Sequence, residues 1–105
     1  MIDINDIKQL CGSNKLRWTN HVLIRLLQRQ IAIDDIIHAI VSGVIIEQYP
    51  EDYPYPSCLV LGVTTNKSKI HVVCGVGEDE LWLITAYYPD KDEWTQDFKL
   101  RKGID

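Results

Sequence analysis

Apolar residues in the first part of the chain recur every three or four positions, which is the spacing of amphipathic helices. This spacing predicts a first helix over Asp3–Cys11, and Gly12 is placed to end it. Thr19 is a suitable N-cap for a second helix over Asn20–Gln30. The apolar stripe predicted for this second helix consists of Val22, Leu23, Leu26 and Leu27.

Asp34 is predicted to cap a third helix, because its carboxylate can accept hydrogen bonds from the N–H groups of the first turn. Gly43 is expected to end this helix, because glycine commonly follows the last helical residue. The buried stripe predicted for it consists of Ile36, Ile37, Ile40 and Val41. The chain up to Gly43 is therefore predicted to be mainly helical.

Beyond Gly43 the pattern changes to short runs of β-branched and aromatic residues separated by turn formers, which is typical of antiparallel strands. The predicted strands are Val44–Tyr49, Cys58–Thr64, Lys69–Val76 and Glu80–Tyr88. The connections TNKS and GEDE are short enough for hairpins. Simple alternation in the last strand separates two faces, one with Leu81, Leu83, Thr85 and Tyr87 and the other with Trp82, Ile84, Ala86 and Tyr88.

The segment after Pro89 is polar, and its Trp94 and Phe98 are four residues apart, as one turn of helix would place them. Helices followed by antiparallel strands predict the α+β class, with N-terminal helices packed on a four-stranded antiparallel sheet. A chain of 105 residues is the size of one ordinary domain. We therefore expect a single domain over residues 1–105.

Composition narrows the class of protein. The hydrophobic fraction of 46% and the charged fraction of 25% are typical of a folded chain. No apolar run approaches the length of a membrane span, and the start MIDINDIKQL lacks the apolar core of a signal peptide, so a cytoplasmic location is expected. The three cysteines are widely spaced without a CxxC pair, so they are predicted to be reduced. No motif indicates a metal or a cofactor.

Charge is unevenly distributed along the chain. The formal net charge is −4, yet no acidic residue occurs from Ile7 to Ile33. The basic residues of that segment are Lys8, Lys15, Arg17, Arg25 and Arg29. A basic N-terminal segment followed by an acidic remainder is suited to binding an anionic ligand with the first part of the chain.

His21, Arg25 and Arg29 recur at four-residue steps and are predicted to form a row along the second helix. Such a row is often a solvated surface, or its arginines pair with carboxylates from elsewhere. The functional alternative is phosphate chemistry, because arginine matches phosphate oxygens and histidine exchanges a proton near neutral pH. These groups are sufficient in kind for metal-free RNA cleavage.

Other candidates carry weaker signals. Tyr87 and Tyr88 end a strand and offer a phenol for proton transfer or a ring for base stacking. His71 joins the site only if its face of the sheet is open, and His38 is expected to be a structural residue. The loop YPEDYPYP is expected to form a wide turn, and its tyrosines are suited to anchoring a protein partner.

Four segments, taken in order, resemble an uncharacterised bacterial family that is described mainly as a domain of unknown function. They are WTNHVLIRLLQRQI, DDIIHAIVSGVIIEQYPEDYPYPSCLVLG, IHVVCGV and LWLITAYYPDKDEWTQDF. The family pattern runs W-T-x-H-A-x-x-R-x-x-x-R, then an acidic helix, then Y-P-x-D-x-P-Y-P-S and I-T-A-Y-x-P. The resemblance covers about Trp18 to Phe98, and Val22 stands where the family usually has alanine.

Members of that family look like small toxins of the RelE, BrnT and MqsR kind, often encoded beside a zinc-finger antitoxin of the MqsA type. The resemblance implies helices packed on a curved antiparallel sheet, as in RelE or barnase, and a metal-independent endoribonuclease activity on RNA with no cofactor. By position, His21, Arg25 and Arg29 match the family's histidine and arginines, and Tyr87 matches its I-T-A-Y tyrosine. The alternative is a noncatalytic protein-binding or RNA-binding module of the same fold.

Overall fold

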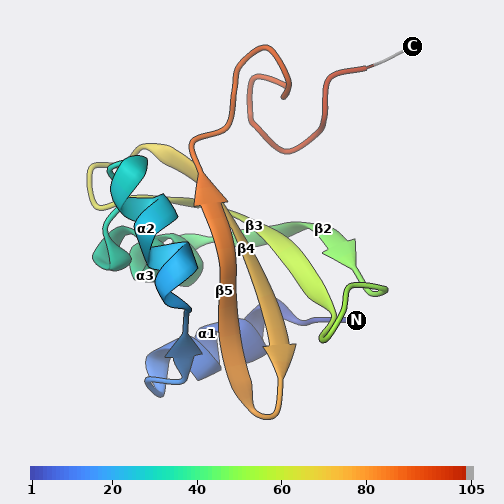
Figure 1. Ribbon diagram of the computed structural model, residues 1–105. Coiled ribbons are helices and arrows are strands. Elements are labelled where there is room, and N and C mark those ends of the chain that lie inside the picture. The colour runs from blue at the N-terminus through green and yellow to red at the C-terminus, as the bar shows by residue number, and fades with distance from the viewer. Residues whose placement is uncertain (104–105) are drawn as a thin grey trace.

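The computed structural model of the protein describes residues 1–103, in which three helices pack around a five-stranded sheet (Figure 1). In chain order the elements are α1 (Ile4–Gly12), β1 (Leu16–Arg17), α2 (Asn20–Gln28), α3 (Ile33–Ser42), β2 (Val44–Tyr49), β3 (Ser57–Val63), β4 (Lys69–Gly77) and β5 (Glu80–Tyr87). The predicted α+β class is confirmed. No helix in this part of the chain has the length and apolar character that crossing a bilayer requires.

The sheet has the strand order β1-β5-β4-β3-β2 and remains open. Strands β2 to β5 pair with antiparallel neighbours, as predicted. The prediction of four strands is wrong, because β1 adds a short parallel strand outside β5, with Leu16 opposite Leu81 and Arg17 opposite Trp82. A strand of two residues is too short to show an alternating pattern, so the sequence carries no signal for it.

The helix ends follow local hydrogen bonding. Asp3 caps α1 by accepting from the Asn5 N–H, so this helix begins at Ile4, one residue later than predicted. Thr19 caps α2 by accepting from the Val22 N–H, as expected. The predicted cap of α3 is wrong, because this helix begins at Ile33 and Ala32 is its N-cap. The Asp35 carboxylate accepts from the Ala32 N–H at 3.4 Å, so the cap lies two residues before the predicted one.

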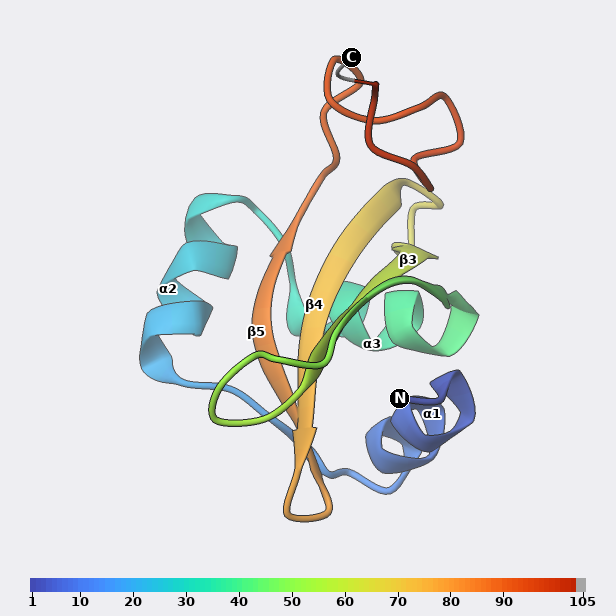
Figure 2. The ribbon, with the colours of Figure 1, turned by 90° about the vertical axis from the view of Figure 1, so that its right-hand side faces the viewer.

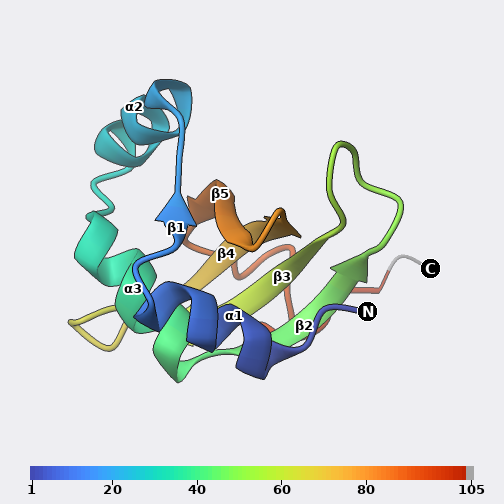
Figure 3. The same ribbon diagram turned by 90° about the horizontal axis from the view of Figure 1, so that it is seen from below.

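Helices α1 and α3 cover one face of the sheet, and α2 stands beside β5 at the sheet's edge (Figure 3). The core lies under α1 and α3 and includes Ile7, Ile36, Ile40, Val60 and Val72. All three cysteines are buried free thiols.

The predicted apolar stripes are only partly correct. On α3 the buried residues are Ile36, Ala39 and Ile40, whereas Ile37 and Val41 are exposed. Each of these exposed residues is one position, about 100°, round the helix from a buried one. On α2, Leu26 is buried and Leu27 is 68% exposed, because this helix packs against a strand edge, which is narrower than a sheet face.

Gly62 of β3 permits the closest contact between the sheet and α3. A Cβ atom at this position would lie 2.0 Å from the Ala39 carbonyl oxygen. We expect Gly62→Ala to lower the free energy of unfolding by about 3 kcal/mol, because a packed helix backbone must move. Urea denaturation measures this, with Gly12→Ala as control because no atom lies within 4 Å of its Cβ. Equal stability of the two variants would contradict the close approach.

A β-bulge in β5 decides which side chains line the open face. Val73 of β4 pairs with Thr85 and Cys74 pairs with Leu83, so Ile84 is one extra residue in β5. The bulge puts Leu81, Leu83 and Ala86 in the core, while Thr85 and Tyr87 pair with residues of the opposite face. The predicted alternation is therefore wrong beyond Leu83, because an extra residue reverses the side-chain direction.

The segment after β5 forms turns and crosses the end of the sheet, which Figure 2 shows at the top. The predicted helical turn is absent here: Trp94 forms an antiparallel bridge with Arg101, and Phe98 has a φ of 61°. Asp97 accepts from the Thr95 hydroxyl and from the Lys99 N–H. These side-chain bonds compete with helical hydrogen bonds and favour the turn.

Candidate functional site

A depression of about 530 Å³ lies between α2 and β5, on the face of the sheet opposite the core. We call it the α2–β5 depression; its lining residues are His21, Val22, Arg25, Arg29, Ile84, Thr85 and Tyr87. The four residues that the sequence singled out as candidates therefore lie together. Three come from α2 and its C-terminal end, and Tyr87 comes from the end of β5.

The packing direction of α2 produces this arrangement. Helix α2 runs alongside β5, as Figure 2 shows, so residues at four-residue steps meet successive residues of the strand. The predicted end at Gln30 is too late: α2 ends at Gln28, Gln30 has a φ of 58°, and the Ile31 N–H donates to the Leu26 carbonyl. Arg29 is thus the C-cap, and its side chain reaches the strand.

Arg29 fastens α2 to the edge of β5. Its Nη1 donates to the Thr85 hydroxyl at 3.0 Å and to the Ala86 carbonyl at 2.8 Å. Within residues 1–103, β1 pairs with this edge of β5 only as far as Trp82, and no other strand pairs beyond that point. The Arg29 guanidinium therefore binds the Ala86 carbonyl, which a neighbouring strand would otherwise bind. A guanidinium has five N–H groups, so the remaining groups of Arg29 are still available to an anion.

Arg25 has no carboxylate partner in the described part of the chain. Of the four arginines, Arg17 pairs with Glu80 at 2.8 Å and Arg101 pairs with Glu47 at 3.0 Å, while Arg25 and Arg29 form no salt bridge within residues 1–103. One nonfunctional interpretation of the row is that its arginines pair with carboxylates from elsewhere. Within residues 1–103 this interpretation is wrong for Arg25 and Arg29. His21 and Arg25 are exposed, so solvent or a ligand can reach both.

His71 lies behind Tyr87 and does not line the depression. It is fully buried, and its Nε2–H donates to the Phe98 carbonyl at 2.9 Å. Nδ1 is then an acceptor, 3.3 Å from the Tyr87 hydroxyl, which donates to it. Burial lowers the pKa of His71 and raises the pKa of Tyr87, so at neutral pH the pair consists of an uncharged imidazole and an uncharged phenol.

A second cluster, which sequence reasoning missed, holds the C-terminal segment over the sheet. Arg101 donates to both carboxylate oxygens of Glu47, at 3.0 and 3.1 Å, and its guanidinium lies 4.7 Å from the centre of the Trp94 ring. The Trp94 ring in turn meets His71 edge-on at 4.4 Å. Burial opposes ionisation of Glu47, but hydrogen bonds from Arg101 and Tyr49 outweigh it and lower the pKa of this carboxyl.

The buried state of His71 predicts a pH dependence of stability. The unfolded chain takes up a proton at this imidazole near pH 6.5, whereas the folded chain resists doing so because burial lowers the pKa. The free energy of unfolding is therefore expected to fall as the pH is lowered through 6.5. Urea denaturation at several pH values between pH 7 and pH 5 measures how the free energy of unfolding depends on pH. His71→Gln keeps a donor for the Phe98 carbonyl but does not titrate, so an unchanged pH dependence in this variant would contradict the assignment.

The remaining sequence candidates lie elsewhere. His38 is exposed and its Nδ1 donates to the Val63 carbonyl at 2.7 Å, which fits the expected structural role. Tyr88 is 46% exposed and does not line the α2–β5 depression.

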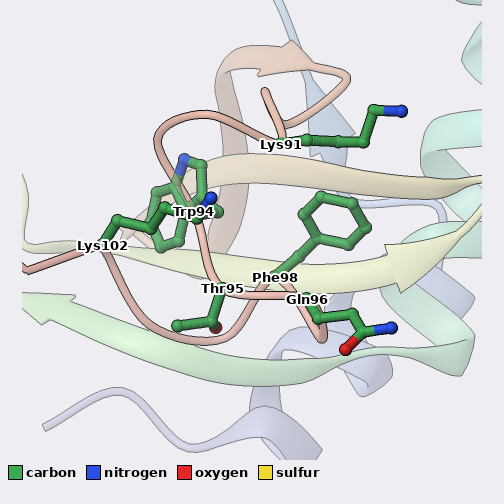
Figure 4. Close-up of a pocket in the computed structure, with 6 residues that line it drawn as sticks. All are labelled: Lys91, Trp94, Thr95, Gln96, Phe98 and Lys102. Atoms are coloured by element: carbon green, nitrogen blue, oxygen red, sulfur yellow. The ribbon is translucent and has the colours of Figure 1, made fainter.

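A smaller depression of about 310 Å³ occurs within the C-terminal segment (Figure 4). Its lining residues are Lys91, Trp94, Thr95, Gln96, Phe98 and Lys102. Lys91 extends away from Trp94 in this view, and none of the sequence-predicted site residues is present. The α2–β5 depression is therefore the stronger candidate for phosphate chemistry.

Comparison with known proteins gives one match. The sequence model of a family described as a domain of unknown function (DUF4258) matches residues 18–88, which include α2, the whole β2–β5 sheet and all four candidate residues. Neither the curated proteins nor the solved structures contain a match to this chain.

Proposed function

Because this chain belongs to the DUF4258 family, whose description assigns no activity, we propose its function from the α2–β5 depression. We propose that the protein is the toxin of a type II toxin-antitoxin system and acts in the cytoplasm as a metal-independent endoribonuclease. The observation that carries the proposal is that His21, Arg25, Arg29 and Tyr87 line one depression in which Arg25 has no carboxylate partner within residues 1–103.

The proposed reaction is attack of a ribose 2′-hydroxyl on the adjacent phosphorus. The 2′-hydroxyl loses one proton and the departing 5′ oxygen takes up one. His21 handles one of these transfers, as general base or as general acid, and solvent water accepts or supplies the other proton. The bond from phosphorus to the 5′ oxygen breaks, which leaves a 2′,3′-cyclic phosphate and a free 5′-hydroxyl. Arg25 and the unused N–H groups of Arg29 bind the nonbridging oxygens, whose negative charge increases in the transition state.

Tyr87 has a supporting role in this proposal. Its hydroxyl donates to the buried His71 Nδ1, so its oxygen is an acceptor for a ribose hydroxyl. That hydrogen bond orients the attacking group and assists the transfer of its proton. Burial keeps the pKa of Tyr87 above its usual value, so the phenol stays neutral and does not repel the phosphate.

The resemblance of the sequence motifs to RelE, BrnT and MqsR toxins also suggests a protein partner, the antitoxin. Helices on one face of an antiparallel meander support a RelE-like or barnase-like fold. Ile24 and Leu27 of α2 are 53% and 68% exposed, and a zinc-finger antitoxin of the MqsA type is the partner we propose to cover them. Such a partner would lie on the same helix as His21 and Arg25, and so close to the depression.

A noncatalytic protein-binding or RNA-binding module is the second candidate. The observation that favours it is the loop between β2 and β3, where Tyr53 is 95% exposed. An exposed aromatic ring on a loop is a common anchor for a partner.

Growth after induced production of this chain alone separates the two candidates. A toxin is expected to arrest growth, and co-production of its antitoxin to restore it. Normal growth at a level of folded protein confirmed by immunoblot would count against the toxin and favour the binding module.

A further inference from the structure

A second depression, of about 590 Å³, adjoins the α2–β5 depression. The two share Val22 and Ile84, so together they form one continuous groove. We call the second one the aromatic depression, because Tyr53, Tyr55 and Trp82 line it. Its lining residues come from α2, from the loop of residues 50–56 and from β4 and β5. Figure 3 shows α2 and this loop on either side of β5 and β4.

The loop that carries the tyrosines is anchored at both ends. A Cβ atom at Gly77 of β4 would lie 2.1 Å from the Tyr55 ring, so the absence of a side chain there makes room for this ring on the sheet. At the other end, the Ser57 hydroxyl donates to the Asp52 carboxylate. Tyr53 lies between these anchors and lines the aromatic depression. Its side chain is 95% exposed, so the ring is not packed into the core and is free to contact a ligand.

Charge and ring chemistry along the groove match a single-stranded nucleic acid. One half offers the guanidinium groups of Arg25 and Arg29, which suit a phosphate, and the other half offers aromatic surface, which suits an unstacked base. Among residues 1–103, Asp52 is the one acidic residue lining the groove, and its carboxylate accepts from Ser57. An acidic peptide would match the arginines but would leave the rings without a planar partner.

We infer that the aromatic depression is a base-binding subsite for single-stranded RNA, in which Tyr53 stacks on a base next to the phosphate held by Arg25. The choice of RNA as the ligand rests on the proposed function. Duplex RNA does not fit this subsite, because its bases are stacked and paired. Stacking on an aromatic ring accepts any base, so the subsite fixes the position of the strand more than its sequence.

Fluorescence anisotropy with a short, labelled 2′-O-methyl RNA tests the subsite without cleavage, because the attacking hydroxyl is blocked. Tyr53→Ala is expected to weaken binding by roughly five- to a hundredfold, the loss typical of removing one stacked ring. Tyr53→Phe keeps the ring and is expected to bind as the wild type does. Tyr88→Ala removes an exposed aromatic residue outside the groove and serves as the matched control.

An oligonucleotide of the same length without bases separates stacking from a general loss of affinity. Wild type and Tyr53→Ala are expected to bind this abasic strand equally, because only phosphates remain. Equal binding of the RNA by wild type and Tyr53→Ala, or no binding by the wild type, would overturn the inference. If the RNA is bound in a Tyr53-dependent way but is not cleaved, the ribonuclease proposal is wrong and the base-binding subsite is supported. If wild type and Tyr53→Ala bind and cleave RNA equally, the subsite is wrong and the ribonuclease proposal is supported.

Discussion

Replacement of Arg25 by alanine is expected to relieve the growth arrest and to slow RNA cleavage by about 100- to 1,000-fold. Arg25 lines the α2–β5 depression and has no carboxylate partner in residues 1–103, so its charge is available to the phosphate. Its loss removes donors at the point where negative charge increases in the transition state. Cleavage rates of a labelled RNA by the purified variants measure the effect.

The control for Arg25→Ala is Lys15→Ala, which removes the same charge from an exposed position outside the depression. This control is expected to cleave at the wild-type rate. Arg25 is itself exposed, so its alanine variant should unfold at the wild-type urea concentration. Equal loss of activity in both variants would indicate a general effect of charge and contradict the assigned role of Arg25.

Replacement of His21 by alanine is expected to slow cleavage by about 100- to 10,000-fold, because the reaction loses its proton donor or acceptor. The pH profile of kcat/KM should lose one limb in this variant, whereas a residue that only binds phosphate would leave the shape unchanged. His38→Ala is the matched histidine control, since His38 is exposed and lies outside the depression. Full cleavage activity of His21→Ala would contradict the assignment of His21 as the group that transfers the proton.

Much of the helical part of the fold could be predicted from local signals. Asp3 and Thr19 are residues that cap helices by their own chemistry, and both do so here. Ala32 has no side-chain acceptor and so offers no such signal, although α3 begins directly after it and Asp35 accepts from its N–H. Which residues of α3 are buried depends on the angle at which the helix meets the sheet, and that angle is a property of tertiary packing.

The errors in the sheet have one physical source, which is that register depends on the neighbouring strand. The bulge at Ile84 reverses the direction of the side chains in the second half of β5. The sequence of this strand contains no residue that predicts a bulge. It also brings Tyr87 to the open face beside Thr85. The prediction that Tyr87 belongs with the arginines came from the resemblance to a family, since alternation alone assigns Tyr87 and the core residue Leu83 to the same face.

The candidate site was partly predictable because His21, Arg25 and Arg29 are close in sequence, and helix geometry alone places them together. The groups that surround Tyr87 are distant in sequence. Glu47 and Arg101 are 54 residues apart, and His71 reaches Phe98 through a backbone carbonyl. Contacts of this kind follow no periodicity, so only the folded chain reveals them.

The most direct test of the central claim is incubation of the purified, antitoxin-free protein with a labelled single-stranded RNA in the presence of EDTA. We expect cleavage that continues despite the chelator, with 2′,3′-cyclic phosphate and 5′-hydroxyl ends, and its loss in Arg25→Ala. Intact RNA after incubation with folded wild-type protein over a range of salt concentrations would contradict the assignment of the α2–β5 depression as a ribonuclease site.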